Sequence, residues 1–332
     1  MSTNANVVEL TGDEITIKER SPFQIVMFRF RKHRLAMVSL VVMSLIFILT
    51  LFAPYIANFK VDEIKVGDYF VPFGSVDEAS GRIHYLGTDN IGRDYFSRLI
   101  YAGRISLTVA FLSVIISETT GVIIGAISGF YGGTLDNVLM RFVEFMLTIP
   151  GLPLLLIISS MLLANEDLIT IPPIILNTVG KLMLLNARDT RSAVLIIMVL
   201  AGFGWLGSAQ LMRGMVLQIK QQTFVEAARS LGASNIWIIF RHMIPNAMAP
   251  IIVSASLGLA GYVVAEAALA FLGFGIQDPI PTWGNMLSAS QTYMVDKPWL
   301  PLIPGLPIFI CSLAFNYIGD GLRDALDPRL KM

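Results

Sequence analysis

Long apolar runs alternate with shorter polar segments along the chain. Six of these runs are long enough to cross a hydrocarbon layer of roughly 30 Å as helices. They lie at residues 36–56, 105–130, 138–163, 193–215, 247–271 and 300–318. The pattern therefore predicts an all-α integral membrane protein, built as a six-transmembrane-helix bundle with a large loop between helices one and two.

Composition supports the same class of protein. Of the 332 residues, 55% are hydrophobic and 14% are charged, a balance typical of integral membrane proteins. The formal net charge is zero, which gives no support to nucleic-acid binding. The first apolar run begins only after residue 35 and is about 20 residues long, so we expect a retained span rather than a cleaved signal peptide.

Positive charges predict the orientation in the membrane. Four cations stand directly at the entry to the first apolar run: Arg29, Arg31, Lys32 and Arg34. Cytoplasmic loops are enriched in lysine and arginine, so we expect a cytoplasmic N-terminus, and six spans return the C-terminus to the same side. This divides the chain into a cytoplasmic tail with an interfacial helix (1–35), the first helix with an external loop (36–104), a five-helix core (105–320) with a cytoplasmic loop (216–244), and a cytoplasmic tail (321–332). Residues 21–34 fit an amphipathic helix on the inner leaflet and a simple topology-setting charge cluster equally well.

The polar segments have local patterns of their own. Residues 69–73 and 82–86 are expected to pair as a small hairpin across a turn-rich stretch. A cap at Thr88 or Asp89 predicts an interfacial helix that leads into the second span. Apolar runs in residues 164–191 are too short and too interrupted to span. We expect there an external insert that dips into the membrane; two extra spans, giving eight in all, are the alternative.

The segment between the fourth and fifth apolar runs predicts two short, well-delimited helices. Thr223 and Glu226 have the spacing of a capping box, and Gly232 stands where a left-handed C-terminal cap would end the helix. Ser234 is positioned to cap a second short helix, and Pro245 to begin the next span. Capping explains each residue singly. A role in docking a soluble partner is compatible with it, because a docking helix must first be a stable helix.

Motifs of catalysis and cofactor binding are missing from the sequence. The pair Gly180-Lys181 lacks the upstream glycine spacing of a phosphate-binding P-loop. The histidines, His33, His84 and His242, are far apart and show no metal-ligand spacing. We therefore expect no cofactor and no metal site in this chain, and a membrane-embedded enzyme is disfavoured.

A few residues within the apolar runs are candidates for special contacts. Glu118 and Glu266 are carboxylates, whose ionised form is costly in hydrocarbon, so each is a candidate pathway or bundle residue. For Glu266 we favour a structural hydrogen bond within the bundle. Glu118 has serine and threonine neighbours in the sequence that can donate hydrogen bonds to its carboxylate. Glu118 is also a candidate for lining a pathway. Gly121 and Gly125 permit close helix approach. Cys311, the single cysteine, is expected to be a small buried residue.

Several motifs resemble the permease subunits of bacterial ABC importers. The EAA loop of that family has the pattern E-A-A, three residues, G, nine residues, I-x-L-P. The matching positions here are Glu226, Ala227, Ala228, Gly232 and Pro245, with His242 and Ile244 in the Ile and Leu slots. Four further stretches resemble the C subunit of the dipeptide and oligopeptide branch, at residues 87–100, 131–141, 265–287 and 319–329.

The resemblance implies a type I importer permease in the inner or plasma membrane. Its EAA loop would form coupling helices that dock on an ATPase, through Glu226, Ala227, Ala228, Arg229, Gly232 and Pro245. The implied partners are a second homologous permease, two cytosolic ATPases that bind ATP and magnesium, an external solute-binding protein and membrane lipid. Peptides are the expected cargo, with oligosaccharides and nickel also carried in this branch.

A secondary transporter or channel without an ATPase is the alternative function. Such a protein is expected to have polar relays across several spans, or broken helices in inverted repeats. The sequence has no visible internal repeat and few charges within its spans, which favours the importer subunit.

Overall fold

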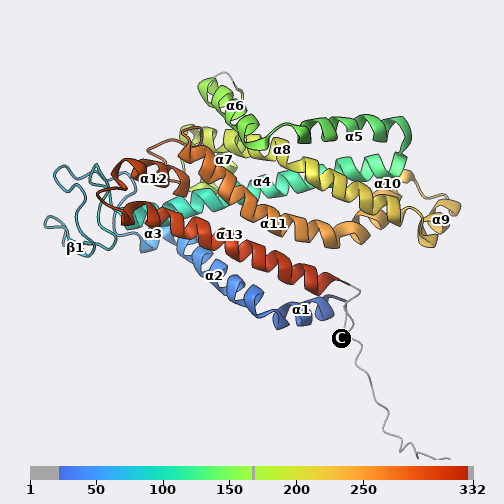
Figure 1. Cartoon of the computed structure of the whole chain (residues 1–332), viewed down its shortest axis with the longest axis horizontal. Coiled ribbons are helices and arrows are strands. Elements are labelled where there is room, and N and C mark those ends of the chain that lie inside the picture. The colour runs from blue at the N-terminus through green and yellow to red at the C-terminus, as the bar shows by residue number, and fades with distance from the viewer. Residues whose placement is uncertain (1–21, 167–168, 328–332) are drawn as a thin grey trace, which may run out of the picture.

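Helices dominate the computed structural model, which describes residues 22–166 and 169–327 (Figure 1). The long helices are α2 (Arg34–Leu51), α4 (Tyr95–Tyr131), α8 (Ala187–Ile219), α11 (Ile244–Phe271) and α13 (Trp299–Leu326). The shorter elements are α1 (Pro22–Lys32), α3 (Ala53–Ile56), strands β1 (Ser75–Val76) and β2 (Ile83–His84), α5 (Gly133–Thr148), α6 (Gly151–Ala164), α7 (Pro173–Met183), α9 (Thr223–Ser230), α10 (Asn235–Ile238), the π-helix η2 (Ile239–Met243), α12 (Trp283–Ser290) and the 3₁₀-helix η3 (Gln291–Tyr293). The β1 loop and α9 lie at opposite ends of the bundle (Figure 1).

The expected all-α membrane bundle is confirmed, with one change in the third span. Within the described residues, five helical runs are long and apolar enough to cross a membrane: α2, α4, α8, the continuous run 235–271, and α13. The sixth candidate is the pair α5 and α6, which is bent by 92°. The predicted span over 138–163 is therefore broken into two helices. Pro150 causes the break, because the residue before a proline is driven out of helical geometry, and Ile149 has ψ 130°.

Helices α4 and α8 pack at very short range, as the glycine spacing predicted. A Cβ atom on Gly121 would lie 2.7 Å from the carbonyl oxygen of Trp205, and one on Gly125 would collide with the backbone of Ala209. Neither glycine position has room for a side chain. Elsewhere in the bundle, the side chain of Cys311 is fully buried, also as expected.

The loop between α3 and α4 differs in detail from the prediction. Strands β1 and β2 pair with Ser75 opposite His84, so the first strand begins after the expected residues 69–73. Positive φ at Gly74, 77°, turns the chain just before β1. The preceding residues bind elsewhere: the backbone N–H of Val71 donates to the hydroxyl of Thr88, over 2.9 Å.

The start of α4 also lies later than the sequence suggested. Asp94 caps this helix through the backbone N–H of Ser97, at 2.7 Å, so the expected cap at Thr88 or Asp89 is wrong. The Asp89 carboxylate instead closes a turn, since it accepts from the backbone N–H of Ile91 at 3.0 Å. Helix α4 then continues unbroken into the membrane-spanning region.

Two short helices fill out the bundle. Helix α7, within the 164–191 insert, has 11 residues, or about 16 Å of rise, and is too short to span. It packs on α8, with Gly180 next to Thr190, so the eight-span alternative is not supported. Helix α1 lies beside the end of α13 (Figure 1), where Arg29 donates to the carbonyl of Asp327 at 2.8 Å.

Candidate functional site

Helix α9 begins one residue earlier than the capping-box prediction requires. Its N-cap is Gln222, without a side-chain cap hydrogen bond, and Thr223 is already the first helical residue. The Thr223 hydroxyl is therefore one position too late to cap, and the predicted box with Glu226 is not formed. The cause lies upstream: α8 ends at Ile219, whose carbonyl accepts the N–H of Gln222 at 3.0 Å and fixes the turn.

The end of α9 has the predicted glycine cap. Gly232 has φ +80°. The N–H of Ala233 bonds to the carbonyl of Ala228 at 3.1 Å, and the N–H of Gly232 to that of Arg229 at 3.0 Å. These two bonds are the Schellman pair, which satisfies carbonyls that the helix end would otherwise leave open. Nothing lies within 4 Å of a Cβ added at Gly232, so backbone geometry selects glycine here.

The two faces of α9 have opposite roles. Val225 and Ala228 are buried in a cluster with side chains of α8, η2 and α11, including Val216 and Met243. The side chains of Glu226, Ala227 and Arg229 face outward and are exposed. Of the four predicted coupling residues within α9, Ala228 is thus a packing residue, and the other three are on the free face.

An apolar surface that the sequence reasoning missed surrounds this helix. Five large side chains around α9 and α10 are exposed: Phe224, Leu231, Ile236, Trp237 and Phe240. Leu231 is 89% exposed, beside the glycine cap. The N-cap bond from Trp237 to Ser234, 3.3 Å, matches the prediction and sets the direction of α10. Exposed apolar surface of this kind marks an interaction site. The signal in the sequence was the clustering of aromatic residues between charged ones.

His242 and Pro245 fit the helix that follows α10. The His242 ring lies 4.8 Å from the Trp237 ring and 5.9 Å from the Phe224 ring, so the unusual residue of the motif packs on aromatic side chains. Pro245 is in the first turn of α11, as predicted. However, the π-helix η2 makes the backbone helical from 235 to 271, so no loop separates the second short helix from the span. A π-helical turn is wider than an α-helical turn. It accommodates Pro245, which has no backbone N–H to donate to a helix hydrogen bond.

Charged contacts connect the α9 segment to the rest of the bundle. Arg213 makes a bidentate pair with Asp136 at the start of α5, at 2.5 and 2.6 Å. Lys220 donates to the carbonyl of Phe130, the penultimate residue of α4. The Arg229 guanidinium lies 5.5 Å from the Phe130 ring centroid. These contacts join the end of α8 to α4 and α5, and bring Arg229 of α9 next to the end of α4.

The two carboxylates within the bundle occupy different surroundings. Glu266 is 1% exposed and accepts from the hydroxyl of Ser106 on α4 at 2.9 Å, the expected hydrogen bond within the bundle. Glu118 is half-buried, and its partners are Ser208 of α8 and Ser254 of α11, not its sequence neighbours. Within the described residues, Oε2 of Glu118 has no hydrogen-bond partner, and neither has Oε1 of Glu266.

Glu118 lines neither of two nearby clefts itself, but residues that it contacts do. Its partner Ser254 lines a cleft of about 580 Å³ between α8, α11 and the end of α13. A second cleft, of about 470 Å³, is lined by residues of α5, α6, α8 and α11, including Gly258 and Tyr262. Tyr262 donates to Ser117, next to Glu118, at 2.6 Å. Polar groups are thus gathered where the two hollows approach each other.

Comparison with known proteins identifies the family. A model described as "Binding-protein-dependent transport system inner membrane component" matches residues 121–332. The chain belongs to this family. A second model, "N-terminal TM domain of oligopeptide transport permease C", matches residues 21–72. The resemblance to ABC-importer permeases of the dipeptide and oligopeptide branch, C type, is therefore confirmed.

Curated relatives in the family align along nearly the whole chain. The dipeptide transport system permease protein DppC of Alkalihalophilus pseudofirmus is 35% identical over 94% of this chain and 91% of its own length. The oligopeptide transport system permease protein OppC of Bacillus subtilis is 33% identical, over 96% and 94%. The glutathione transport system permease protein GsiD of Pectobacterium atrosepticum is 32% identical, over 94% and 93%.

Membership of this permease family defines the kind of protein that the chain is. The chain is a non-catalytic membrane subunit of an ABC importer, so its functional surfaces are for contact and passage rather than for chemistry. The family match includes α9 and Glu266, whereas Glu118 lies outside both matched regions.

Proposed function

We propose that this permease couples ATP hydrolysis by a cytosolic ATPase to import, with α9 as its docking helix. The observation that supports this most strongly is the construction of α9. One face is buried against α8 and α11 through Val225 and Ala228, and the other presents Glu226 and Arg229 within an exposed apolar surface. A helix fixed on one side and free on the other can transmit a push from a soluble partner.

The complete importer contains four further subunits in this proposal. A second, homologous permease forms the other half of the pathway, two ATPases bind ATP and magnesium, and a solute-binding protein delivers the cargo. The named relatives transport dipeptides, oligopeptides and glutathione, so we propose a short peptide as cargo. Exposed side chains of α2, such as Val38 and Leu45, face membrane lipid.

The orientation follows from where the docking helix must lie. Both termini and α9 are in the cytoplasm, and the β1 loop is outside. With Cys311 replaced by alanine, a cysteine at exposed Glu78 should react with an impermeant thiol reagent in intact cells. A cysteine at Asp324, near the end of α13, should react only after permeabilisation. The reverse pattern would contradict the orientation.

Glu118 is the pathway residue of this proposal. Its partner Ser254 lines the first cleft, and one of its oxygens is unpaired within the described residues. A carboxylate there can accept a hydrogen bond from the amino group of a passing peptide. Glu118→Gln should then raise the KM for peptide uptake more than it lowers the maximal rate, while Glu266→Gln, at a fully buried residue that lines neither cleft, should leave the KM unchanged. An unchanged KM in Glu118→Gln would remove it from the pathway.

Reconstitution in liposomes tests the function as a whole. Peptide uptake should require both permeases, the ATPases, the binding protein and ATP on the ATPase side, and it should stop when the ATPase is left out. The alternative is a secondary transporter, in which this chain alone would take up peptide along a proton or sodium gradient. Gradient-driven uptake by the chain alone would overturn the proposal.

A further inference from the structure

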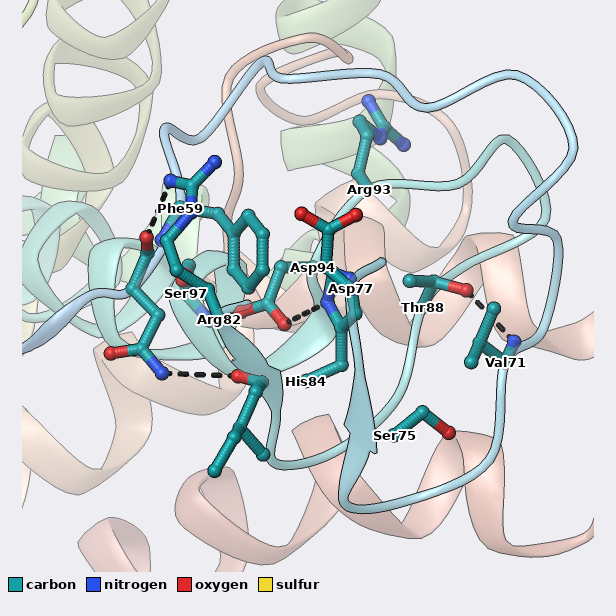
Figure 2. A network of polar contacts seen from close by, with 12 residues as sticks. Phe59, Val71, Ser75, Asp77, Arg82, His84, Thr88, Arg93, Asp94 and Ser97 are labelled. Atoms are coloured by element: carbon teal, nitrogen blue, oxygen red, sulfur yellow. Dashed lines mark hydrogen bonds and ion pairs between the residues drawn. The ribbon is translucent and has the colours of Figure 1, made fainter. Parts of the chain in front are cut away.

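The loop between α3 and α4 gathers three potential metal ligands, two of which, Asp77 and His84, are labelled in Figure 2. Side chains of Asp68, Asp77 and His84 bring ligand atoms within 4.8 Å of one another. They come from three separate parts of the loop: a turn, the residue after β1, and β2. Asp77 and His84 are buried, at 5% and 2% exposure, and Asp68 is half-buried. The three histidines of the sequence gave no sign of this group, because two of its members are aspartates.

His84 is held in one orientation. Its Nδ1 bonds to the carboxylate of Asp94 at 2.8 Å, drawn as a dashed line in Figure 2. Its ring stacks on that of Phe59, with centroids 4.1 Å apart and planes 6° from parallel. Asp94 is itself fixed, since its other oxygen caps α4. Histidine ligands of metals characteristically donate their second ring N–H to a carboxylate in this way, which leaves Nε2 free to ligate.

Nε2 of His84 lacks the partner that its burial calls for. No hydrogen-bond partner is present for this atom among residues 22–166 and 169–327. A buried imidazole nitrogen without a donor or acceptor is destabilising, and each such atom in a native protein needs an explanation. A cation bound at Nε2 supplies one.

Asp77 also has a free ligand atom. The backbone N–H and hydroxyl of Ser80 and the ammonium of Lys65 all bind Oδ2. Within the described residues, no side-chain or backbone hydrogen bond is made to Oδ1. The side chain is therefore oriented by one oxygen while the other remains available.

The charges near this group favour an additional cation. Three carboxylates, Asp68, Asp77 and Asp94, lie near one ammonium, that of Lys65. The nearby guanidinium of Arg82 is already paired with Glu63, at 2.8 Å. The net charge of these groups is negative when the imidazole of His84 is neutral.

We propose that Asp68, Asp77 and His84 bind a divalent cation, with zinc as the first candidate. One imidazole nitrogen and two carboxylate oxygens are a donor set suited to zinc, with water completing the tetrahedron. Bound there, the cation ties the turn at Asp68 to both strands and fixes the loop against the start of α4. Lys65 is its competitor: without the metal the ammonium binds Asp77 and, in that same position, lies 4.9 Å from the centroid of the Phe59 ring.

Metal content of the assembled importer tests the site. The complex is purified with a tag free of histidine, incubated with zinc chloride, passed through a desalting column and measured by mass spectrometry for zinc. Wild type should retain one more zinc ion per complex than Asp68→Asn, a change at a half-buried position that the fold tolerates. Glu78→Gln, an exposed acid next to Asp77, is the matched control and should retain wild-type zinc. Equal zinc in wild type and Asp68→Asn would overturn the site.

Lys65→Met separates the metal site from a purely structural ion pair. If the ammonium competes with the metal, its removal should tighten zinc binding by about tenfold, the size expected for one nearby repelling charge at a partly solvated site. Zinc should then also raise the melting temperature of the variant. If Lys65 is instead the permanent counter-ion of Asp77, the variant should bind no zinc and melt at the same lowered temperature with and without it, and the proposal fails.

Discussion

Gly232→Val is the most informative change at the docking helix. The Schellman cap needs a left-handed residue here, at φ +80°, and nothing lies within 4 Å of the added Cβ. The cost is therefore one of backbone geometry alone, not of crowding within this chain. For an L-residue with a side chain it amounts to about 1–2 kcal/mol.

That cost is small for the fold and large for the cap. A penalty of 1–2 kcal/mol lowers the population of the capped conformation by a factor of roughly 5–30. The bundle itself does not depend on the cap, because α9 is held by the burial of Val225 and Ala228. We expect the variant to insert in the membrane at nearly the wild-type level, to recover little ATPase on co-purification, and to lose most peptide uptake.

Gly232→Asn is the matched control, because asparagine is the next most tolerant residue at a left-handed cap. Membrane level by immunoblot, recovered ATPase and peptide uptake are measured for all three proteins. The asparagine variant should retain most of the uptake that the valine variant loses. Wild-type uptake and ATPase recovery in Gly232→Val would refute the link between cap geometry and docking.

Other changes test the docking face and the scaffold behind it. Glu226→Gln should leave the melting temperature unchanged, since the predicted capping box is not formed. Reduced uptake at a normal membrane level would indicate a charged contact with the ATPase. A lower melting temperature would contradict the observed cap. Gly125→Leu should destabilise the bundle by about 1–3 kcal/mol through overpacking against α8, seen as a lower melting temperature, whereas Gly207→Ala, which has open space for a Cβ, should be neutral. Asp136→Asn should cost about 1–2 kcal/mol by weakening the pair with half-exposed Arg213, and unchanged thermal stability would show that this pair does not support α9.

The sequence predicted those features that depend on local chemistry. Gly232 was identifiable as a left-handed cap because only a residue without Cβ adopts that geometry freely. Gly121 and Gly125 were identifiable as a packing face from their spacing. Ser234 and Pro245 have the cap and helix-start roles expected of them.

Features that depend on tertiary structure were missed or misplaced. The capping box failed because the end of α8, at Ile219, moved the helix start by one residue. The partners of Glu118 come from α8 and α11 and cannot be read from its neighbours. The bend at Pro150 was visible in the Pro-Gly pair, but hydropathy averaged over the whole window concealed it.

Chemical cross-linking of α9 tests the central claim most directly. In the Cys311→Ala background, a cysteine replaces either Ala227, on the exposed face of α9, or Val225, whose side chain is fully buried on the opposite face. The assembled importer is treated with a short thiol-to-amine cross-linker. Docking through the free face predicts a cross-link to the ATPase from position 227 and little or none from position 225. No ATPase cross-link from position 227, or equal yields from both positions, would contradict the account.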